Sequence, residues 1–381
     1  MAGLADIRWA RRPDDLARAV DELSAAGEIA LDTEGDSLHH YPERLALVQI
    51  GLPHGGVWLI DPLALTDLGP LAPVFADAAR TLVVHAGDND LVHLKRRYGL
   101  AFASVFDTAI AARFLGGKAL GLDVLLTTYL GVTLPPSRQK DYWSMRPLDP
   151  SQLAYAAADV QHLFALKARL TDELARIGRL AWVEEECAAL AAQPAPARPV
   201  DPDAYLGVKG ARDLSPRGLA VLRELWTLRE QLARAADRPP FKIFGEDTLL
   251  RVAQALPRDA TALASIPGAT PRVLGRWGAA IIGAVERGLA LDDVTLPAVP
   301  RHPRPVIPGA MSRRIDKLRR WRTAATERIG LEPGIVLPNR LITAIAAAAP
   351  RTLDELGRVE GMRRWRVDTL GAEILAALAA A

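Results

Sequence analysis

The chain has 381 residues, of which 50% are hydrophobic and 24% charged, which excludes wholesale disorder and is too long for one ordinary domain. The single cysteine excludes an internal disulfide, and no apolar run reaches the roughly 18 residues of a membrane helix, so we expect a cytoplasmic protein with no membrane partner. The net charge of +2 is unevenly divided: residues 1–190 carry 18 Lys and Arg against 25 Asp and Glu, whereas residues 191–381 carry 29 against 20.

Two proline-rich stretches divide the chain into three predicted domains. Residues 191–204 and 291–310 lack an apolar pattern that could pack, and the second stretch contains five prolines. Both are therefore predicted to be extended linkers. The predicted domains are residues 1–190, 205–290 and 311–381.

The first predicted domain has the pattern of a mixed sheet flanked by helices. A helical pattern at residues 16–23 is followed by three apolar runs typical of strands in hairpin succession, at residues 28–35, 44–52 and 56–63. A helix at 71–79 and a short buried strand at 81–85 come next, and only helical patterns follow up to residue 190. Strands first and helices afterwards favour an α/β domain.

The second and third predicted domains contain no convincing strand, and they resemble each other. Pro257 and Gly268 in the first copy correspond to Pro350 and Gly361 in the second, an offset of 93 residues. Amphipathic helical patterns surround these positions in both copies. The repeat therefore predicts two small all-α bundles.

Carboxylates in the first domain form the candidate catalytic site. Asp32 and Glu34 are two residues apart on a predicted central strand, so their side chains project from the same face. Asp90 follows a buried strand where a helix begins, and Tyr155 lies four residues before Asp159, on the same face of another predicted helix. Buried ionised carboxylates are costly to desolvate, so this cluster needs cations.

Divalent metal ions would satisfy that need. Oxygen ligands without cysteines or a histidine cluster favour Mg²⁺ or Mn²⁺ over Zn²⁺. Two such ions about 3.5–4 Å apart can activate a water on one side of a phosphodiester and stabilise the departing oxygen on the other. The four carboxylates therefore predict phosphodiester hydrolysis with two divalent ions.

The same residues resemble the motifs of a known enzyme family. The first domain resembles the DEDD-type 3′–5′ exonucleases, which have a ribonuclease H-like fold, and the whole chain resembles the bacterial ribonuclease D family. Asp32 and Glu34 match the first motif, Asp90 the second, and Tyr155 with Asp159 the third, in its tyrosine form. The resemblance implies that the four carboxylates hold both metals, that Asp32 bridges them, and that Tyr155 orients the attacking water.

The helical repeats resemble the HRDC module, which binds nucleic acids. Together the resemblances imply a metal-dependent, monomeric 3′–5′ exoribonuclease that releases nucleoside 5′-monophosphates from structured RNA with a single-stranded 3′ end, tRNA precursors being the expected substrate. No motif reads the 2′-hydroxyl, so a DNA exonuclease of the same superfamily is an alternative. A catalytically silent RNA-binding protein is another.

Substrate contacts are predicted at three residues of the first domain and in two basic stretches. His85 ends a buried strand, and Trp143 could stack on a base or pack in the core. Arg146 lies in PPSRQKDYWSMRPL, residues 135–148, which resembles a ribonuclease D segment before the third motif. The basic stretches, residues 301–328 and 363–366, are candidates for RNA contact; solvated helix faces, or an arginine-rich genome composition, would give the same pattern.

Overall fold

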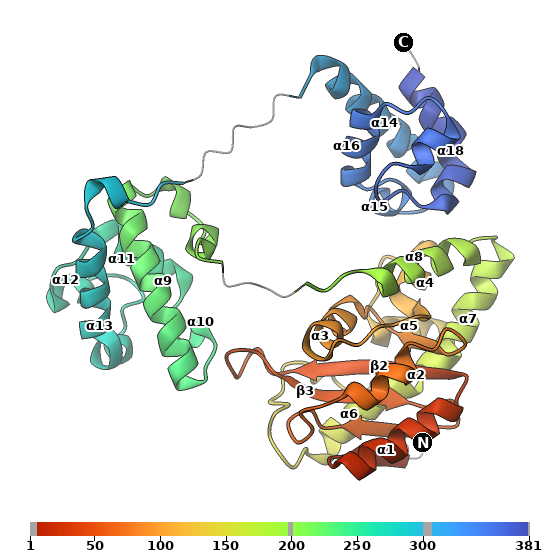
Figure 1. Ribbon diagram of the computed structural model, residues 1–381, viewed down its shortest axis with the longest axis horizontal. Helices are drawn as coiled ribbons and strands as arrows, with labels where there is room; N and C mark the ends of the chain where they lie inside the picture. The colour runs from red at the N-terminus through yellow and green to blue at the C-terminus, as the bar shows by residue number, and fades with distance from the viewer. Residues whose placement is uncertain (1–5, 197–200, 300–306, 380–381) are drawn as a thin grey trace. The chain divides into compact units, whose positions relative to one another are not determined.

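The computed structural model describes residues 6–196, 201–299 and 307–379 (Figure 1). Contacts divide these residues into two compact units. The first contains the described residues before Gly35, those from Leu45 to Pro196, and those from 307 onward. The second contains Gly35–Arg44 and residues 201–299. Parts of both predicted linkers, residues 197–200 and 300–306, lie outside the described residues, and the three-domain division stays a prediction.

The first unit is built on a six-stranded mixed sheet in the order β1-β4-β3-β2-β5-β6. β3 and β4 are antiparallel, whereas β1 pairs with β4, and β5 with both β2 and β6, in parallel. The strands are β1 (Asp6–Ala10), β2 (Glu28–Gly35), β3 (Leu45–Gly51), β4 (Gly56–Ile60), β5 (Thr81–Val84) and β6 (Val105–Asp107). This confirms the predicted mixed sheet.

The two end strands of the sheet were missed from the sequence. β1 is a partly exposed edge strand of only five residues, and β6 has three residues, too few to show a period. The prediction that only helical patterns follow residue 85 was therefore wrong at β6.

Helices cover both faces of the sheet. On one face, Leu16 and Leu23 of α1 pack against a core that includes Ile29 and Leu31 of β2. On the opposite face, Ala30 of β2 belongs to the core of α6. Since side chains alternate along a strand, Asp32 and Glu34 share the α6 face with Ala30. The helices are α1 (Pro13–Ala25), α2 (Ala72–Phe75), α3 (Asp88–Tyr98), α4 (Thr108–Phe114), α5 (Leu122–Leu130), α6 (Pro150–Gln161), α7 (Leu163–Arg176) and α8 (Leu180–Ala192).

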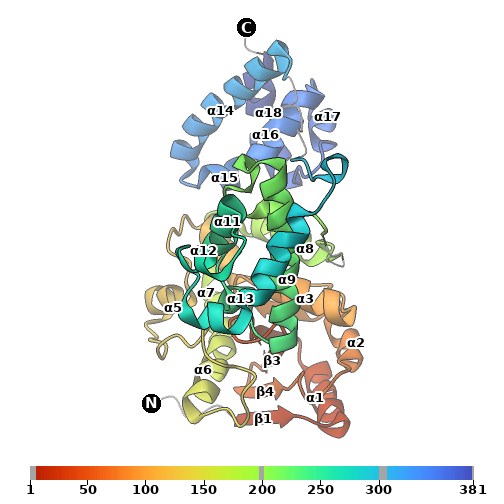
Figure 2. The same ribbon diagram turned by 90° about the vertical axis from the view of Figure 1, so that its left-hand side faces the viewer.

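The two helical repeats have matching elements. The first consists of α9 (Pro216–Ala236), α10 (Pro240–Ile243), α11 (Glu246–Ala255), α12 (Ala260–Ala264) and α13 (Pro271–Leu289); the second consists of α14 (Gly309–Ile329), α15 (Pro333–Val336), α16 (Asn339–Ala348), α17 (Leu353–Gly357) and α18 (Arg364–Ala379). Each helix of the second begins 93 residues after its counterpart, which confirms the repeat. α9 and α13 lie side by side (Figure 2). Residues 201–299 and 307–379 contain no strand, and no described helix is long and apolar enough to cross a membrane.

The second repeat shares a hydrophobic core with α4, α7 and α8 of the first unit. The Trp365 ring stacks on Trp182 with centroids 4.7 Å apart and meets the Phe114 ring edge-on at 5.5 Å. Cys187 of α8 is fully buried nearby, and its Sγ accepts a hydrogen bond from the Asp107 backbone N–H at 3.2 Å. Burial raises the pKa of this thiol to about 12. The sequence did not predict that the C-terminal helices pack in this way.

Candidate active site

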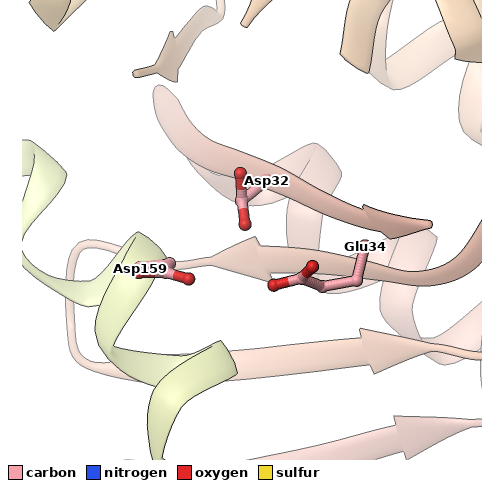
Figure 3. A group of neighbouring side chains, drawn as sticks. All are labelled: Asp32, Glu34 and Asp159. Carbon is pink, nitrogen blue, oxygen red and sulfur yellow. The ribbon is translucent and has the colours of Figure 1, made fainter. Parts of the chain in front are cut away.

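Three of the predicted metal ligands meet at one end of β2. Asp32 and Glu34 point from this strand toward Asp159 of α6 (Figure 3), and one carboxylate oxygen from each residue lies within 4.8 Å of the other two. Only 6% of Glu34 and 8% of Asp159 is exposed. The capping box at the start of α6, formed by Asp149 and Gln152, fixes where this helix begins and therefore where Asp159 stands.

The fourth predicted ligand, Asp90, lines the same pocket but lies beside the group of three. It is in the first turn of α3, after the end of β5. Its carboxylate accepts a hydrogen bond from the hydroxyl of Thr33, which lies between Asp32 and Glu34 on β2. Thr33 was not predicted as a site residue from the sequence, because strand alternation points its side chain away from those of its two acidic neighbours.

The acidic side chains are crowded together. Burial, followed by the charges of the neighbouring carboxylates, raises the pKa of Asp32 well above its usual range and that of Glu34 to about 9. Burial raises the pKa of Asp159 to about 7, although a hydrogen bond from Tyr155 acts to lower this pKa. Among the described residues that line the pocket there is no Lys or Arg. Such a set of hard oxygen donors fits divalent ions.

The carboxylates open into a cavity of about 970 Å³. One wall comes from the segment between α5 and α6, including Pro135, Ser137 and Gln139. A volume of this size is large enough for a nucleotide.

Tyr155 lies beside Asp159 and is 6% exposed. Burial, followed by the negative charges of Asp159 and Glu34, raises its pKa above the ordinary value. The phenol therefore keeps its proton at neutral pH. In this state it can donate a hydrogen bond but cannot act as a base.

His85 lines the cavity as well. Its Nδ1 lies 2.9 Å from the Thr108 hydroxyl, which donates its own proton to the Val84 carbonyl at 3.1 Å. Burial lowers the pKa of His85, so the ring is neutral at pH 7.

Trp143 and Arg146 lie outside the cavity lining, in the described segment between α5 and α6. Trp143 is completely buried, and its ring packs at 6.1 Å from the Tyr155 ring, so it has no free face for a base. Arg146 forms an ion pair with Asp61. In this structure both side chains make their contacts within the protein.

Comparisons with known proteins agree with this geometry. A family described as 3′–5′ exonuclease matches residues 7–175, and the HRDC domain matches residues 218–285 and 311–378. Ribonuclease D of Pseudomonas paraeruginosa is 33% identical, over 99% of this chain and 98% of the relative. Ribonuclease D of Escherichia coli is 32% identical, over 74% and 75%. The chain belongs to the ribonuclease D family.

A solved structure of the same family supports the fold assignment. The crystal structure of the Escherichia coli enzyme superimposes with a TM-score of 0.71 and 27% identity, covering 98% of each chain. The ribonuclease H-like fold followed by two HRDC domains, implied by the sequence motifs, is thereby confirmed. As a member of the ribonuclease D family, the chain is a 3′–5′ exoribonuclease.

The two basic stretches predicted to contact RNA differ in how exposed their side chains are. Within residues 363–366, two side chains are used for packing: Arg366 is 4% exposed and pairs with Glu186 at 2.8 Å, and the Trp365 indole N–H donates to the same carboxylate at 3.0 Å. The prediction of an RNA patch was therefore wrong for these two side chains. In the other stretch, the described part of α14 leaves Arg313, Arg319 and Arg320 exposed.

Proposed function

We propose that the carboxylate pocket hydrolyses the terminal phosphodiester at RNA 3′ ends and releases nucleoside 5′-monophosphates. The observation that carries this proposal is the meeting of three carboxylates within 4.8 Å, two of them buried, in a cavity wide enough for a nucleotide whose described lining contains no Lys or Arg. Asp32, Glu34, Asp90 and Asp159 would hold two divalent ions, Mg²⁺ or Mn²⁺. When bound, these ions supply positive charge that acidifies the attacking water and stabilises the departing oxygen.

The chain's own groups have separate tasks in this reaction. Asp32, Glu34 and Asp159 each offer an oxygen within 4.8 Å of the other two, so these carboxylates would hold the cations together with Asp90. Tyr155 retains its proton, and its hydroxyl, beside Asp159, takes part in the hydrogen bonding that orients the attacking water. His85, neutral and on the cavity wall, contacts the terminal nucleotide.

The proposed substrate is structured RNA with a single-stranded 3′ end, such as a tRNA precursor. The Escherichia coli relative is described as an exoribonuclease involved in structured RNA processing. The exposed arginines of α14 offer positive charge to an RNA backbone. We propose that the enzyme acts as a monomer in the cytoplasm, where its single buried thiol needs no partner.

The decisive experiment incubates a 3′-extended tRNA and a fully paired duplex with Mg²⁺, Mn²⁺ or a chelator. Stepwise shortening of the tRNA from its 3′ end, in either metal and not in chelator, is expected. Asp32→Asn and Asp90→Asn should abolish shortening while circular dichroism stays unchanged. Asp88→Asn is the matched control, because Asp88 is exposed and two residues from Asp90 on α3. Activity of the Asp32 variant in Mg²⁺ would refute the assigned roles.

The DNA alternative is tested with matched RNA and DNA 3′ overhangs on the same duplex. RNA should be shortened faster if this chain is an exoribonuclease by preference. Equal or faster shortening of DNA would assign the pocket to both nucleic acids.

A further inference from the structure

The segment between α5 and α6, residues 131–149, forms part of the cavity wall although it contains neither helix nor strand. It carries Ser137, whose hydrogen bond to Tyr155 opposes the increase in the tyrosine's pKa. It also carries Trp143, against whose ring the Tyr155 ring packs. The position of the Tyr155 hydroxyl therefore depends on how this irregular segment is held.

Arg146 holds the segment through all five N–H groups of its guanidinium. Nε donates to Asp61 Oδ2 at 2.7 Å, and one Nη2 proton donates to Asp61 Oδ1 at 2.9 Å. The other Nη2 proton reaches the Ala46 carbonyl of β3 at 2.7 Å. Nη1 donates to the carbonyls of Trp143 and Met145 at 2.6 and 2.9 Å. Since an arginine has five N–H donors, none remains for a phosphate.

The partner of Arg146 belongs to the rigid sheet. Asp61 directly follows β4 and is 3% exposed. A buried carboxylate gripped at both oxygens by one guanidinium is a geometrically specific contact. Arg146 therefore ties the backbone of Trp143 to β3 and the end of β4, and the Trp143 indole N–H in turn donates to the Arg138 carbonyl at 3.1 Å.

We propose that Arg146 is a positioning residue for hydrolysis: clamped on Asp61, it fixes Trp143 and the segment carrying Ser137 so that the Tyr155 hydroxyl is held beside Asp159. This inference rests on the role proposed for Tyr155 and gives Arg146 no contact with RNA. It explains why Arg146, which lies in the same segment as the cavity-lining Gln139, uses all of its hydrogen-bond donors within the protein. A small displacement of Tyr155 would slow the chemical step without weakening RNA binding.

The test measures kcat, KM and Mn²⁺ affinity for Arg146→Lys, which keeps the charge but loses the two-pronged contact. A decrease in kcat on the order of 10- to 100-fold is expected, with KM and Mn²⁺ affinity nearly unchanged. The same substitution in a Tyr155→Phe background should cause no further decrease, because the hydroxyl that Arg146 positions is already absent. An equal decrease in both backgrounds would overturn the proposal and indicate a general structural role.

Arg11→Lys is the matched control, since Arg11 lies 3.8 Å from the same Asp61 carboxylate, farther away than Arg146 at 2.7 Å. It should leave kcat unchanged. If Arg146→Lys does not fold, Trp143→Phe should show the same dependence on Tyr155, and additive losses there would equally overturn the inference. An unchanged kcat for Tyr155→Phe alone would instead refute the proposed role of Tyr155.

Discussion

The hydroxyl of Thr33 donates a hydrogen bond to the carboxylate of Asp90, although the two residues lie 57 positions apart in the sequence. The bond joins β2 to the first turn of α3. Burial raises the pKa of Asp90, and the hydrogen bond from Thr33 partly opposes this increase. Asp90 is thus kept at the pocket edge, next to the group formed by Asp32, Glu34 and Asp159.

Replacing Thr33 by valine should weaken metal binding, because Asp90 then loses the bond that favours its ionised form. The concentration of Mn²⁺ needed for half-maximal hydrolysis should rise by about 10-fold, as for other residues that support metal ligands. Thr33→Ser keeps the hydroxyl and should behave almost like the natural enzyme. Identical metal requirements for both variants would show that the bond is dispensable.

Stability of the metal-free protein should fall as the pH rises. The pKa values of Glu34 and Asp159, about 9 and about 7, lie above the ordinary values of 4.5 and 3.8, so the folded state holds protons that the unfolded chain has released. The unfolding free energy therefore decreases between about pH 5 and about pH 9. Thermal unfolding in chelator should show this decrease, and Mg²⁺ should reverse most of it by binding the deprotonated carboxylates. A rise of Tm with pH in chelator would contradict the assignment.

Neutralising Glu186 should destabilise the contact between α8 and the second HRDC domain. Glu186 accepts hydrogen bonds from the buried Arg366 and from Trp365, and glutamine would leave the arginine without its counter-charge. A loss of about 3–5 kcal/mol in the free energy of unfolding is expected for Glu186→Gln, measured by urea denaturation. The exposed Glu184, two residues away, provides the control, and Glu184→Gln should change stability by no more than about 0.5 kcal/mol. Equal values for the two variants would mean that the pair contributes nothing.

The spacing of apolar and acidic residues in the sequence was sufficient to predict the central strands and most of the carboxylate site. The apolar runs around Ile29 and Val48 fill two faces of a buried sheet, and the spacing of Asp32 and Glu34 places both on the face that α6 covers. The four-residue spacing from Tyr155 to Asp159 likewise brings both to the cavity. These relationships are local, so they can be derived from the geometry of one strand or one helix.

Features that depend on distant packing could not be derived in this way. An aromatic side chain in a loop stacks on a ligand or enters the core according to the path of the whole segment, and Trp143 enters the core. The arginines after Gly361 have the composition of an RNA-binding patch, yet Arg366 forms an ion pair with Glu186 of α8. β6 is recognisable only beside β5, its neighbour in the sheet.

Chemical labelling of the buried Cys187 can be used to detect separation of α8 from the sheet. Its sulfur lies between α8 and the start of α4, and thiol reagents attack only an accessible thiolate. Covalent labelling therefore requires α8 to separate from the sheet, and the sequence offers no second thiol to confuse the signal. The labelling rate in native buffer thus reports how readily α8, against which the second HRDC domain packs, separates from the sheet.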